Sequence, residues 1–372
     1  MAMSKVNIMD VCSEIFAGGD APKNRMSIEK TSKYTIPIYS NGEDRNGLYG
    51  YTDVARVNLP SITISARGTI GYTAIRKEPF VPIVRLIAVT PIPELIDIHY
   101  LYYAIKNFNF SGSGTSIPQL TVPMIKQCNF PLPPLDEQRK IAAVLDKVSD
   151  LIAKRRQQLD KLNELIKARF VEMFGDPISN PHKWELQSLS NICKDIYGGG
   201  TPSKSHPEYF EGSIPWVSPK DMKSDIIMDS IDHITEEAVE NSSTKMVPKG
   251  AVLMVIRSGI LKHTLPVAIA AVELTVNQDM KAFIVGENVT AKFLMYYFRT
   301  IEADVLSGVR SVTADNIDFK EFQKRMVILP PIELQNRFDA FVEQTEKTKT
   351  TINKSLEKLE TLKKALMQEY FG

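Results

Sequence analysis

The chain has 372 residues, of which 43% are hydrophobic and 24% charged, and this composition is typical of a globular protein with more than one core. No apolar run approaches the roughly 20 residues that cross a bilayer, and the first residues lack the apolar core of a signal peptide. We therefore expect a cytoplasmic protein with no membrane contact. The formal net charge of +1 does not by itself indicate a protein that binds nucleic acid.

Residues 1–133 are predicted to form a first mixed α/β domain. Short runs rich in β-branched and aromatic residues indicate strands, and an amphipathic pattern indicates a helix. The predicted elements are strands at residues 36–39, 61–65 and 79–89 and a helix at residues 98–108. A loop rich in turn-forming residues, 41–47, lies between the first two strands, and the glycine turn Arg67-Gly68-Thr69-Ile70-Gly71 follows the second.

A long helix is predicted next, within residues 134–175. It opens with Pro133-Pro134-Leu135-Asp136-Glu137-Gln138 and stops at Phe174-Gly175. Its apolar residues fall mostly at alternating steps of four and three, which places them on one stripe of a helix. The stripe consists of Ile141, Leu145, Val148, Ile152, Leu159, Leu162, Ile166 and Met173.

Residues 176–330 repeat the order of the first domain. Residues 214–218 match 36–40, Arg257 matches Arg67, and the pair Tyr296-Tyr297 matches Tyr102-Tyr103. The offset drifts from 181 residues near the paired cysteines to 197 at the prolines, so insertions separate the two copies in their loops. The cores agree while the loops differ, as expected for one scaffold that carries two different recognition surfaces.

A second long helix is predicted within residues 331–372. Pro330-Pro331-Ile332-Glu333-Leu334-Gln335 opens it, at a constant offset of 197 from the first helix. Its stripe consists of Phe338, Val342, Thr345, Lys349, Ile352, Leu356, Leu359, Leu362, Leu366 and Tyr370. Since one helix leads into the second domain and the other leaves it, helices that pack along their length run antiparallel. We therefore predict an α+β fold, with two α/β domains related by pseudo-two-fold symmetry and separated by two long antiparallel coiled-coil helices.

The sequence contains no pattern that indicates catalysis. It lacks the Gly-rich turn of a Rossmann-type methyltransferase, the Asn/Asp-Pro-Pro-aromatic stretch of an adenine methyltransferase and the acidic cluster of a nuclease. Gly198-Gly199-Gly200 is interpreted as a flexible loop. The three cysteines and five histidines lack metal-ligand spacing, and Cys12 and Cys193 are interpreted as small buried residues. We therefore expect a chain that is not an enzyme and has no cofactor and no metal.

The duplicated helical stretch resembles a known family. Pro133-Pro134-Leu135-Asp136-Glu137-Gln138-Arg139-Lys140-Ile141, with the long helix after it, resembles the central conserved region of the specificity subunit of type I restriction–modification systems. Residues 330–372 resemble its distal conserved region. The glycine turn at 67–71 and Val276-Asn277-Gln278-Asp279-Met280 are similar to stretches of that family's target recognition domains. The resemblance implies target recognition domains at 1–133 and 176–330, and spacer helices at 134–175 and 331–372.

The resemblance also implies a function and partners. Each target recognition domain reads one half of a bipartite, discontinuous site on double-stranded DNA, and the coiled coil acts as the spacer. Two modification subunits, which bind S-adenosylmethionine and methylate adenine, dock on this scaffold. Restriction subunits join them as an ATP-dependent translocase and nuclease, so the catalytic activities belong to the partners.

Base readout requires polar side chains at loop tips, while lysines and arginines fix the register on phosphates. By this criterion the candidate DNA-contacting residues of the first domain are Tyr39, Ser40, Asn41, Arg67, Thr69, Thr115 and Ser116. Those of the second domain are Trp216, Ser218, Lys220, Arg257, Ser258, Lys262, Arg310 and Ser311. Other interpretations stay open, because the two matched arginines can pair with acids and the tryptophan can belong to a core.

Two other functions stay open as well. A coiled-coil adaptor that binds only proteins fits the net acidic character of residues 176–334, which carry 16 Lys and Arg against 21 Asp and Glu. It does not explain two α/β domains with polar loop tips. A fused methyltransferase or endonuclease remnant is opposed by the missing catalytic motifs.

Overall fold

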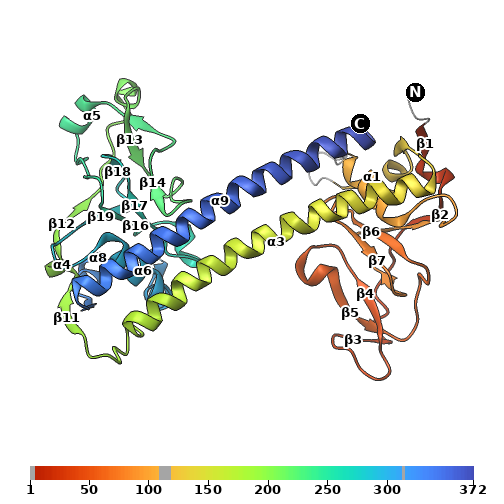
Figure 1. The fold of residues 1–372 in the computed structure, drawn as a ribbon, viewed down its shortest axis with the longest axis horizontal. Helices are drawn as coiled ribbons and strands as arrows, with labels where there is room; N and C mark the ends of the chain where they lie inside the picture. Colours follow the sequence, from red (N-terminus) through yellow and green to blue (C-terminus); the bar gives the residue numbers. More distant parts are fainter. Residues whose placement is uncertain (1–4, 109–118, 312–314) are drawn as a thin grey trace. The chain divides into compact units, whose positions relative to one another are not determined.

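A computed structural model describes residues 5–108, 119–311 and 315–372. For Arg310 and Ser311 it describes the backbone and not the side chain. The chain divides into two compact units, one made of Met1–Arg156 with Asn353–Gly372 and the other of Gln157–Ile352. Helices α3 (Leu135–Phe174) and α9 (Ile332–Phe371), of 40 residues each, contribute to both units (Figure 1).

The first unit contains two four-stranded sheets. One has the order β2 (Cys12–Ala17), β9 (Leu86–Pro91), β6 (Ser61–Ser65), β7 (Thr73–Arg76). The other has the order β3 (Met26–Ser27), β5 (Leu48–Thr52), β4 (Ile36–Tyr39), β8 (Val81–Pro82). Strand β1 (Lys5–Asn7) pairs with β10 (Asn129–Pro131). The remaining elements are α1 (Ile98–Asn107), α2 (Val122–Ile125) and the 3-10 helices η1 (Ile8–Asp10) and η2 (Asp44–Gly47).

The second unit is built on a five-stranded sheet with the order β12 (Cys193–Gly198), β19 (Met280–Val285), β16 (Val252–Val255), β17 (Val267–Ala270), β14 (Ile226–Ile227). A three-stranded sheet has the order β15 (His233–Ile234), β13 (Ile214–Val217), β18 (Thr275–Val276). Two pairs are β11 (Glu185–Ser188) with β22 (Met326–Leu329) and β20 (Arg310–Ser311) with β21 (Asp315–Asn316). The helices are α4 (Leu189–Ile192), α5 (Glu236–Glu240), α6 (Ala291–Thr300), α7 (Glu302–Ser307), α8 (Phe319–Phe322), η3 (Pro207–Phe210) and η4 (Gly259–Lys262).

The order of the strands confirms the duplication. The order β2-β9-β6-β7 of the first unit returns in the second as β12-β19-β16-β17. Both first strands carry a register shift at the same place, between Cys12 and Glu14 and between Cys193 and Asp195. The parallel pair β4·β8 likewise returns as β13·β18. Both cysteines are buried, as predicted from their matched positions.

Helices α1 and α6 are equivalent, but the match of their tyrosine pairs in the sequence is wrong by one residue. In the first unit the ring of Tyr100 lies 4.9 Å from that of Phe371, and in the second the ring of Phe293 lies 5.0 Å from that of Phe174. Since Phe371 and Phe174 occupy the same repeat position, Tyr100 corresponds to Phe293. In the correct register Tyr103 corresponds to Tyr296 and Tyr102 to Met295, so the shared Tyr-Tyr dipeptide is a coincidence shifted by one position.

The long helices pack in opposite directions within each unit. In the first unit Arg156 of α3 pairs at 2.7 Å with Glu360 near the end of α9. In the second unit Phe170, near the end of α3, contacts Phe338 at the start of α9, with 5.4 Å between the ring centroids. The predicted stripe is correct except at Leu362, which is 46% exposed. The half-buried Lys363 takes its place, with its ammonium 5.8 Å from the ring of Tyr103.

Candidate nucleic-acid interface

Three segments of the second unit converge where its two sheets meet. The loop between β18 and β19 connects the sheets, and the backbone N–H of Asn277 in this loop donates at 2.9 Å to Val217, the last residue of β13. The backbone N–H of Ile256, just after β16, donates at 2.8 Å to Asp279 in the same loop. Side chains that follow β13 and β16 are therefore held beside this loop.

A groove opens at this convergence. Its walls are formed by Lys204, Phe210, Trp216, Ser218, Pro219, Lys220, Asp232, Ser258, Asn277 and Asp279. Four candidates from the sequence are among them, namely Trp216, Ser218, Lys220 and Ser258. Lysines, hydrogen-bonding side chains and aromatic rings in one groove are typical of a surface that contacts DNA phosphates and base edges.

Sequence reasoning missed several walls of the groove. Asn277 and Asp279 lie in the segment that resembles target recognition domains, so a signal for them was present. Lys204 and Asp232 carried none, because neither directly follows a predicted strand.

Trp216 and Ser218 are fixed by hydrogen bonds. The indole Nε1–H of Trp216 donates at 3.0 Å to the carbonyl of Gly200, and the half-buried ring lies edge-on to Phe210. The Ser218 hydroxyl and its backbone N–H both donate at 2.8 Å to one carboxylate oxygen of Asp221. The tryptophan is therefore both packed and part of the wall, while Lys220 beside it is exposed.

Arg257 pairs with an acid, one of the alternatives left open by the sequence. Its Nε donates at 2.6 Å to Asp279, and 47% of the arginine side chain is still exposed. Its backbone bridges Asn316 of β21, which pairs in turn with Arg310 of β20. The backbones of Arg310 and Ser311 therefore run next to the groove, although their side chains lie outside the described part of the chain.

Ser258 and Lys262 follow Arg257 in the chain. The Ser258 hydroxyl accepts from the backbone N–H of Ile260 and caps η4, and the backbone N–H of Ser258 donates at 3.0 Å to Asp315. Lys262 ends η4 and lies 3.8 Å from the Asp315 carboxylate, with most of its side chain exposed. Lys262 is not among the residues that line the groove.

The three glycines 198–200 are packed rather than free, so their interpretation as a flexible loop is wrong. A Cβ added to Gly199 would lie 1.7 Å from the carbonyl oxygen of Asn277, and the backbone N–H of Gly200 donates at 3.1 Å to Val276. Only glycine permits so close an approach between two backbones. This contact positions the loop that carries Asn277 and Asp279.

In the first unit the structure also brings predicted residues together. The Asn41 amide donates at 3.0 Å to the carbonyl of Arg67, and the Ser40 hydroxyl donates at 3.2 Å to Asn41. Tyr39 precedes them at the end of β4 and lies edge-on to Phe80. This cluster is equivalent to the start of the groove in the second unit, because β4 and β13 are equivalent strands.

Thr69 is exposed at the tip of the glycine turn, where Gly68 and Gly71 have φ values of +74° and +80°. These left-handed conformations explain both glycines. Thr115 and Ser116 lie outside the described residues.

The two units differ in charge at the place where the two sheets of each unit meet. The residue equivalent to Asp279 is Arg85, because Ala66 donates its backbone N–H to Arg85 just as Ile256 does to Asp279. Within the described part of the first unit, Arg67 therefore has no carboxylate at the place where Arg257 finds one.

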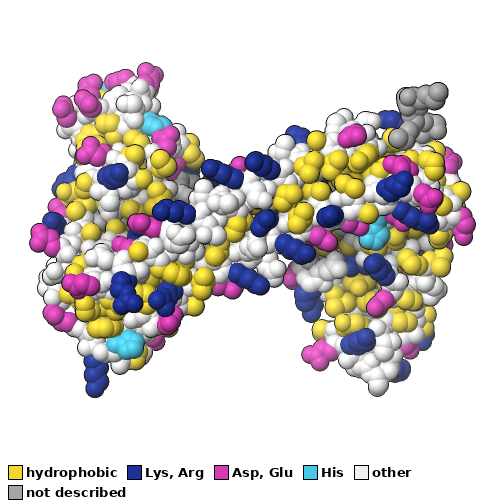
Figure 2. Space-filling view, viewed as in Figure 1, with side chains coloured by type: hydrophobic (Ala, Val, Ile, Leu, Met, Phe, Trp, Pro, Cys, Tyr) yellow, Lys and Arg dark blue, Asp and Glu magenta, His cyan; other side chains and the backbone are white. Residues whose placement is uncertain are grey.

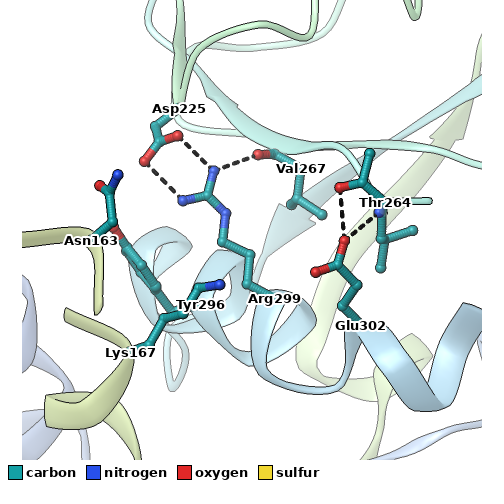
Figure 3. Close-up of a pocket in the computed structure, with 9 residues that line it drawn as sticks. Asn163, Lys167, Asp225, Thr264, Val267, Tyr296, Arg299 and Glu302 are labelled. Carbon is teal, nitrogen blue, oxygen red and sulfur yellow. Dashed lines mark hydrogen bonds and ion pairs between the residues drawn. The ribbon is translucent and has the colours of Figure 1, made fainter. Parts of the chain in front are cut away.

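A separate pocket of the second unit lies against α3 and is a structural site. Figure 3 shows Arg299 reaching Asp225 with two hydrogen bonds, of 2.8 and 2.7 Å, and the carbonyl of Val267 at 2.9 Å. Burial favours a higher pKa for Asp225, but the hydrogen bonds and charge of Arg299 outweigh it and hold that pKa below its usual range. Glu302 accepts from Thr264 and from the backbone N–H of Leu265. These groups satisfy one another.

The part of the chain that the structure describes holds neither a metal-binding cluster nor a helix that could span a membrane. Residues 5–108, 119–311 and 315–372 contain no group of three or more His, Cys, Asp or Glu side chains placed to hold a metal ion. Among the helices that the structure describes, none combines the length and the apolar character of a membrane span.

Two copies of one α/β unit, each with a polar edge between its sheets, define a duplicated recognition protein. A sequence model for the type I restriction modification DNA specificity domain matches residues 2–164 and 181–363. The chain therefore belongs to this family, and the model matches once for each copy of the repeat.

Relatives and solved structures agree with this assignment. The chain is 31% identical over 271 residues to the Escherichia coli EcoR124I/EcoR124II specificity subunit, a match that covers 70% of this chain and 66% of that relative, just under two thirds. The fold is similar to that of the type I S subunit from M. genitalium, with a TM-score of 0.63, 15% identity and coverage of 100% and 96%. The fold is also similar to that of a chain from a study of complex assembly and conformational transition of the type I R-M system. That match has a TM-score of 0.59 and 18% identity, and it covers 99% of this chain and 97% of the other.

Proposed function

We propose that this chain is a DNA-sequence specificity subunit in which each unit reads one half of a bipartite, discontinuous site on double-stranded DNA. The observation that carries this proposal is the repeated edge, where the loops after β4 and β6 in one unit correspond to those after β13 and β16 in the other. The differences between the copies are concentrated in these loops, as two different half-sites require.

The groove of the second unit supports a division of labour among its side chains. Lys204 and Lys220 supply positive charge for phosphates, which fix register without reading sequence. Asn277, Asp279 and Ser258 offer donors and acceptors that match base edges in a major groove. The indole of Trp216 closes one wall. In the first unit we assign DNA contact to Tyr39, Asn41 and Arg67, with Thr69, Thr115 and Ser116 as further contacts.

The domain limits predicted from the sequence follow the same scheme. We assign target recognition to residues 1–133 and 176–330, and a spacer role to residues 134–175 and 331–372. Helices of 40 residues are about 60 Å long at 1.5 Å per residue. One turn of duplex DNA is about 34 to 36 Å, so rods of this length suit half-sites separated by unread base pairs.

Two copies of one partner are supported by an exposed stripe that occurs identically on both long helices. In α3 this repeated stripe is Lys161, Leu165, Ala168 and Glu172, and in α9 it is Lys358, Leu362, Ala365 and Glu369. Leu165 is 47% exposed and Leu362 is 46% exposed. Folding does not require identical residues on a solvent face, whereas two equal docking surfaces do. Figure 2 shows lysine and arginine side chains on the visible face of these helices.

We assign the repeated stripe to two modification subunits, which methylate adenine with S-adenosylmethionine, while restriction subunits add ATP-dependent translocation and cleavage. One similar structure comes from a study of complex assembly of the type I R-M system, which supports such an assembly. In this proposal the chain itself is not an enzyme and uses no cofactor, and the complex works in the cytoplasm, where DNA is found.

The test is to express the chain with its modification subunits and to map methylated adenines across a genome. A two-part sequence with a fixed gap is expected, and exchanging residues 1–133 for those of another family member is expected to change one half only. A change in both halves contradicts independent units. Since the net charge is only +1, we expect the chain alone to bind DNA weakly, and tight specific binding without partners contradicts this.

A further inference from the structure

Arg76, at the end of β7 in the first unit, carries a buried charge without an acidic partner. The residue is 4% exposed, and within the described residues no carboxylate lies at ion-pair distance from it. Its Nε donates at 3.0 Å to the Thr63 hydroxyl, and one Nη donates at 2.9 Å to the carbonyl of Asn46. Its guanidinium lies 3.7 Å from the centroid of the Tyr39 ring. Burial lowers the pKa of Arg76, which reflects the cost of this charge.

The second unit shows that the fold does not need this arginine. Strand register makes Ile62 equivalent to Val252 and Ile75 equivalent to Ile269, so Arg76 corresponds to Ala270. The polar trio of the first unit is Tyr39, Thr63 and Arg76, and the apolar trio that replaces it is Val217, Leu253 and Ala270. The apolar trio is completely or almost completely buried. The same scaffold therefore packs well without the charge. The polar trio is thus not required for folding, and we look for its role in a feature that only the first unit has.

Arg76 holds the loop 42–47 through a hydrogen bond to the backbone of that loop. Arg45, Asn46 and Gly47 have consecutive left-handed conformations, with φ values of 45°, 56° and 75°. Asparagine and glycine adopt such values readily, but arginine rarely does unless the surroundings impose them. The Asn46 carbonyl accepts from Arg76, and its side-chain oxygen accepts at 2.9 Å from the Tyr72 hydroxyl. At the other end of the loop, the backbone N–H of Gly42 donates at 3.2 Å to Ser65.

The loop directly follows Ser40 and Asn41, and so belongs to the candidate interface. Its tip exposes Glu43, Asp44 and Arg45. In the second unit the loop after the equivalent Ser218 is held by Asp221 instead, which accepts from Ser218 and, at 2.9 Å, from the backbone N–H of Ile231. Each unit thus fixes its own loop, one with an arginine and the other with an aspartate.

We propose that Arg76 is a positioning residue for the first half-site: it holds loop 42–47 in a rigid form that enters a groove of duplex DNA. This inference rests on the proposed function. Arg45 has the donor geometry to read guanine, and Glu43 and Asp44 can accept from the amino group of cytosine. The left-handed backbone presents these tips, and Arg76 acts through that backbone rather than through a base.

The test copies the second unit into the first. The triple variant Tyr39→Val, Thr63→Leu, Arg76→Ala, assembled with its modification subunits, is expected to keep the thermal transition of the wild type. Its methylated sites are expected to retain the second half-site and to lose base preference in the first, with at least tenfold weaker binding to the wild-type site. Arg56→Ala, at an exposed arginine over the ring of Phe16, is the control and is expected to change neither.

A second variant covers the case in which the triple variant does not fold. Asp44→Ala with Arg45→Ala changes only exposed side chains and is expected to alter the same half-site. An unchanged methylated sequence in this variant, or in a folded triple variant, overturns the inference while leaving the proposed function intact. If the wild-type complex itself shows no two-part sequence, the proposed function fails and the inference fails with it.

Discussion

Gln335, in the first turn of α9, accepts a hydrogen bond of 2.9 Å from the backbone N–H of Thr290, the N-cap residue of α6. Its amide donates at 2.9 Å to the carbonyls of Asn288 and Pro330. In the first unit Gln138 makes the same three bonds, to Asp97, Leu95 and Pro133. The glutamine of each Pro-Pro-x-x-x-Gln motif is therefore a buried clamp that joins a long helix to the helix packed against it.

Replacing this glutamine with methionine, which has a similar volume, is expected to destabilise the unit concerned. Gln335→Met leaves the N–H of Thr290 and the carbonyls of Asn288 and Pro330 without this partner, and since only the bond to Pro330 is fully buried we expect a cost of about 1 to 3 kcal/mol. Chemical denaturation measures this loss. Gln157→Met, at an exposed position of α3, is the control, and equal stabilities for the two variants would contradict the clamp.

The Asp225–Arg299 pair is expected to couple strand β14 to helix α6. Arg299→Met leaves Asp225 mostly shielded from water without its cation, which we expect to cost about 2 to 3 kcal/mol after allowance for partial exposure. Adding Asp225→Asn is expected to recover part of the loss, with a coupling energy of about 1 to 2 kcal/mol in a double-mutant cycle. Additive effects of the two substitutions would show that the bonds in Figure 3 contribute independently.

The sequence was sufficient for features set by local pattern. The constant offset between the motifs at Gln138 and Gln335 predicts the duplication, and the steps of four and three predict both long helices. At Leu362 the pattern fails because Leu362 and Lys363 both continue the steps of four and three. Which of the two side chains faces the other helix depends on a neighbour from another element. There Lys363 places its ammonium over the ring of Tyr103, while the leucine is exposed.

The candidate site was predictable only where a loop directly follows a strand. Ser218 and Arg257 were found because they end predicted strands, and the structure places them at one edge. Lys204 and Asp232 were not, because loop paths depend on contacts that are distant in the chain. Arg76 was missed for a related reason: in the sequence it is an ordinary residue near a strand end, and its burial under Tyr39 is decided by the second sheet.

Asp339 is expected to make stability depend on pH. Burial, and to a lesser extent the charge of Glu343, raises its pKa from 3.8 to about 6, although Thr290 donates to it and Lys292 is near. The folded state binds this proton more tightly than the unfolded state, so stability falls as pH rises from about 4 to 6.

Asp339→Asn removes this dependence while its side-chain oxygen still accepts from Thr290. The variant is expected to be more stable than the wild type by roughly 1 to 2 kcal/mol at pH 7 and to lose that advantage at pH 4. Denaturation curves across this range measure the difference. Asp150→Asn, at an exposed site on α3, is the control. An advantage that grows toward low pH would contradict the assignment.

The repeated stripe is expected to bind two copies of one partner independently. Leu165→Arg places a charge in one docking surface and Leu362→Arg does so in the other, so each variant is expected to assemble with one modification subunit instead of two. Mass photometry or sedimentation of the complex measures the stoichiometry.

Leu151→Arg is a matched control, since Leu151 is also exposed, at 38%, but corresponds to Thr348 in the second copy. If the control loses a subunit as readily as the two stripe variants, the surface is larger than the stripe. If the double variant Leu165→Arg, Leu362→Arg still binds two subunits, docking occurs elsewhere, because an arginine buried against an apolar partner without an acid is strongly unfavourable.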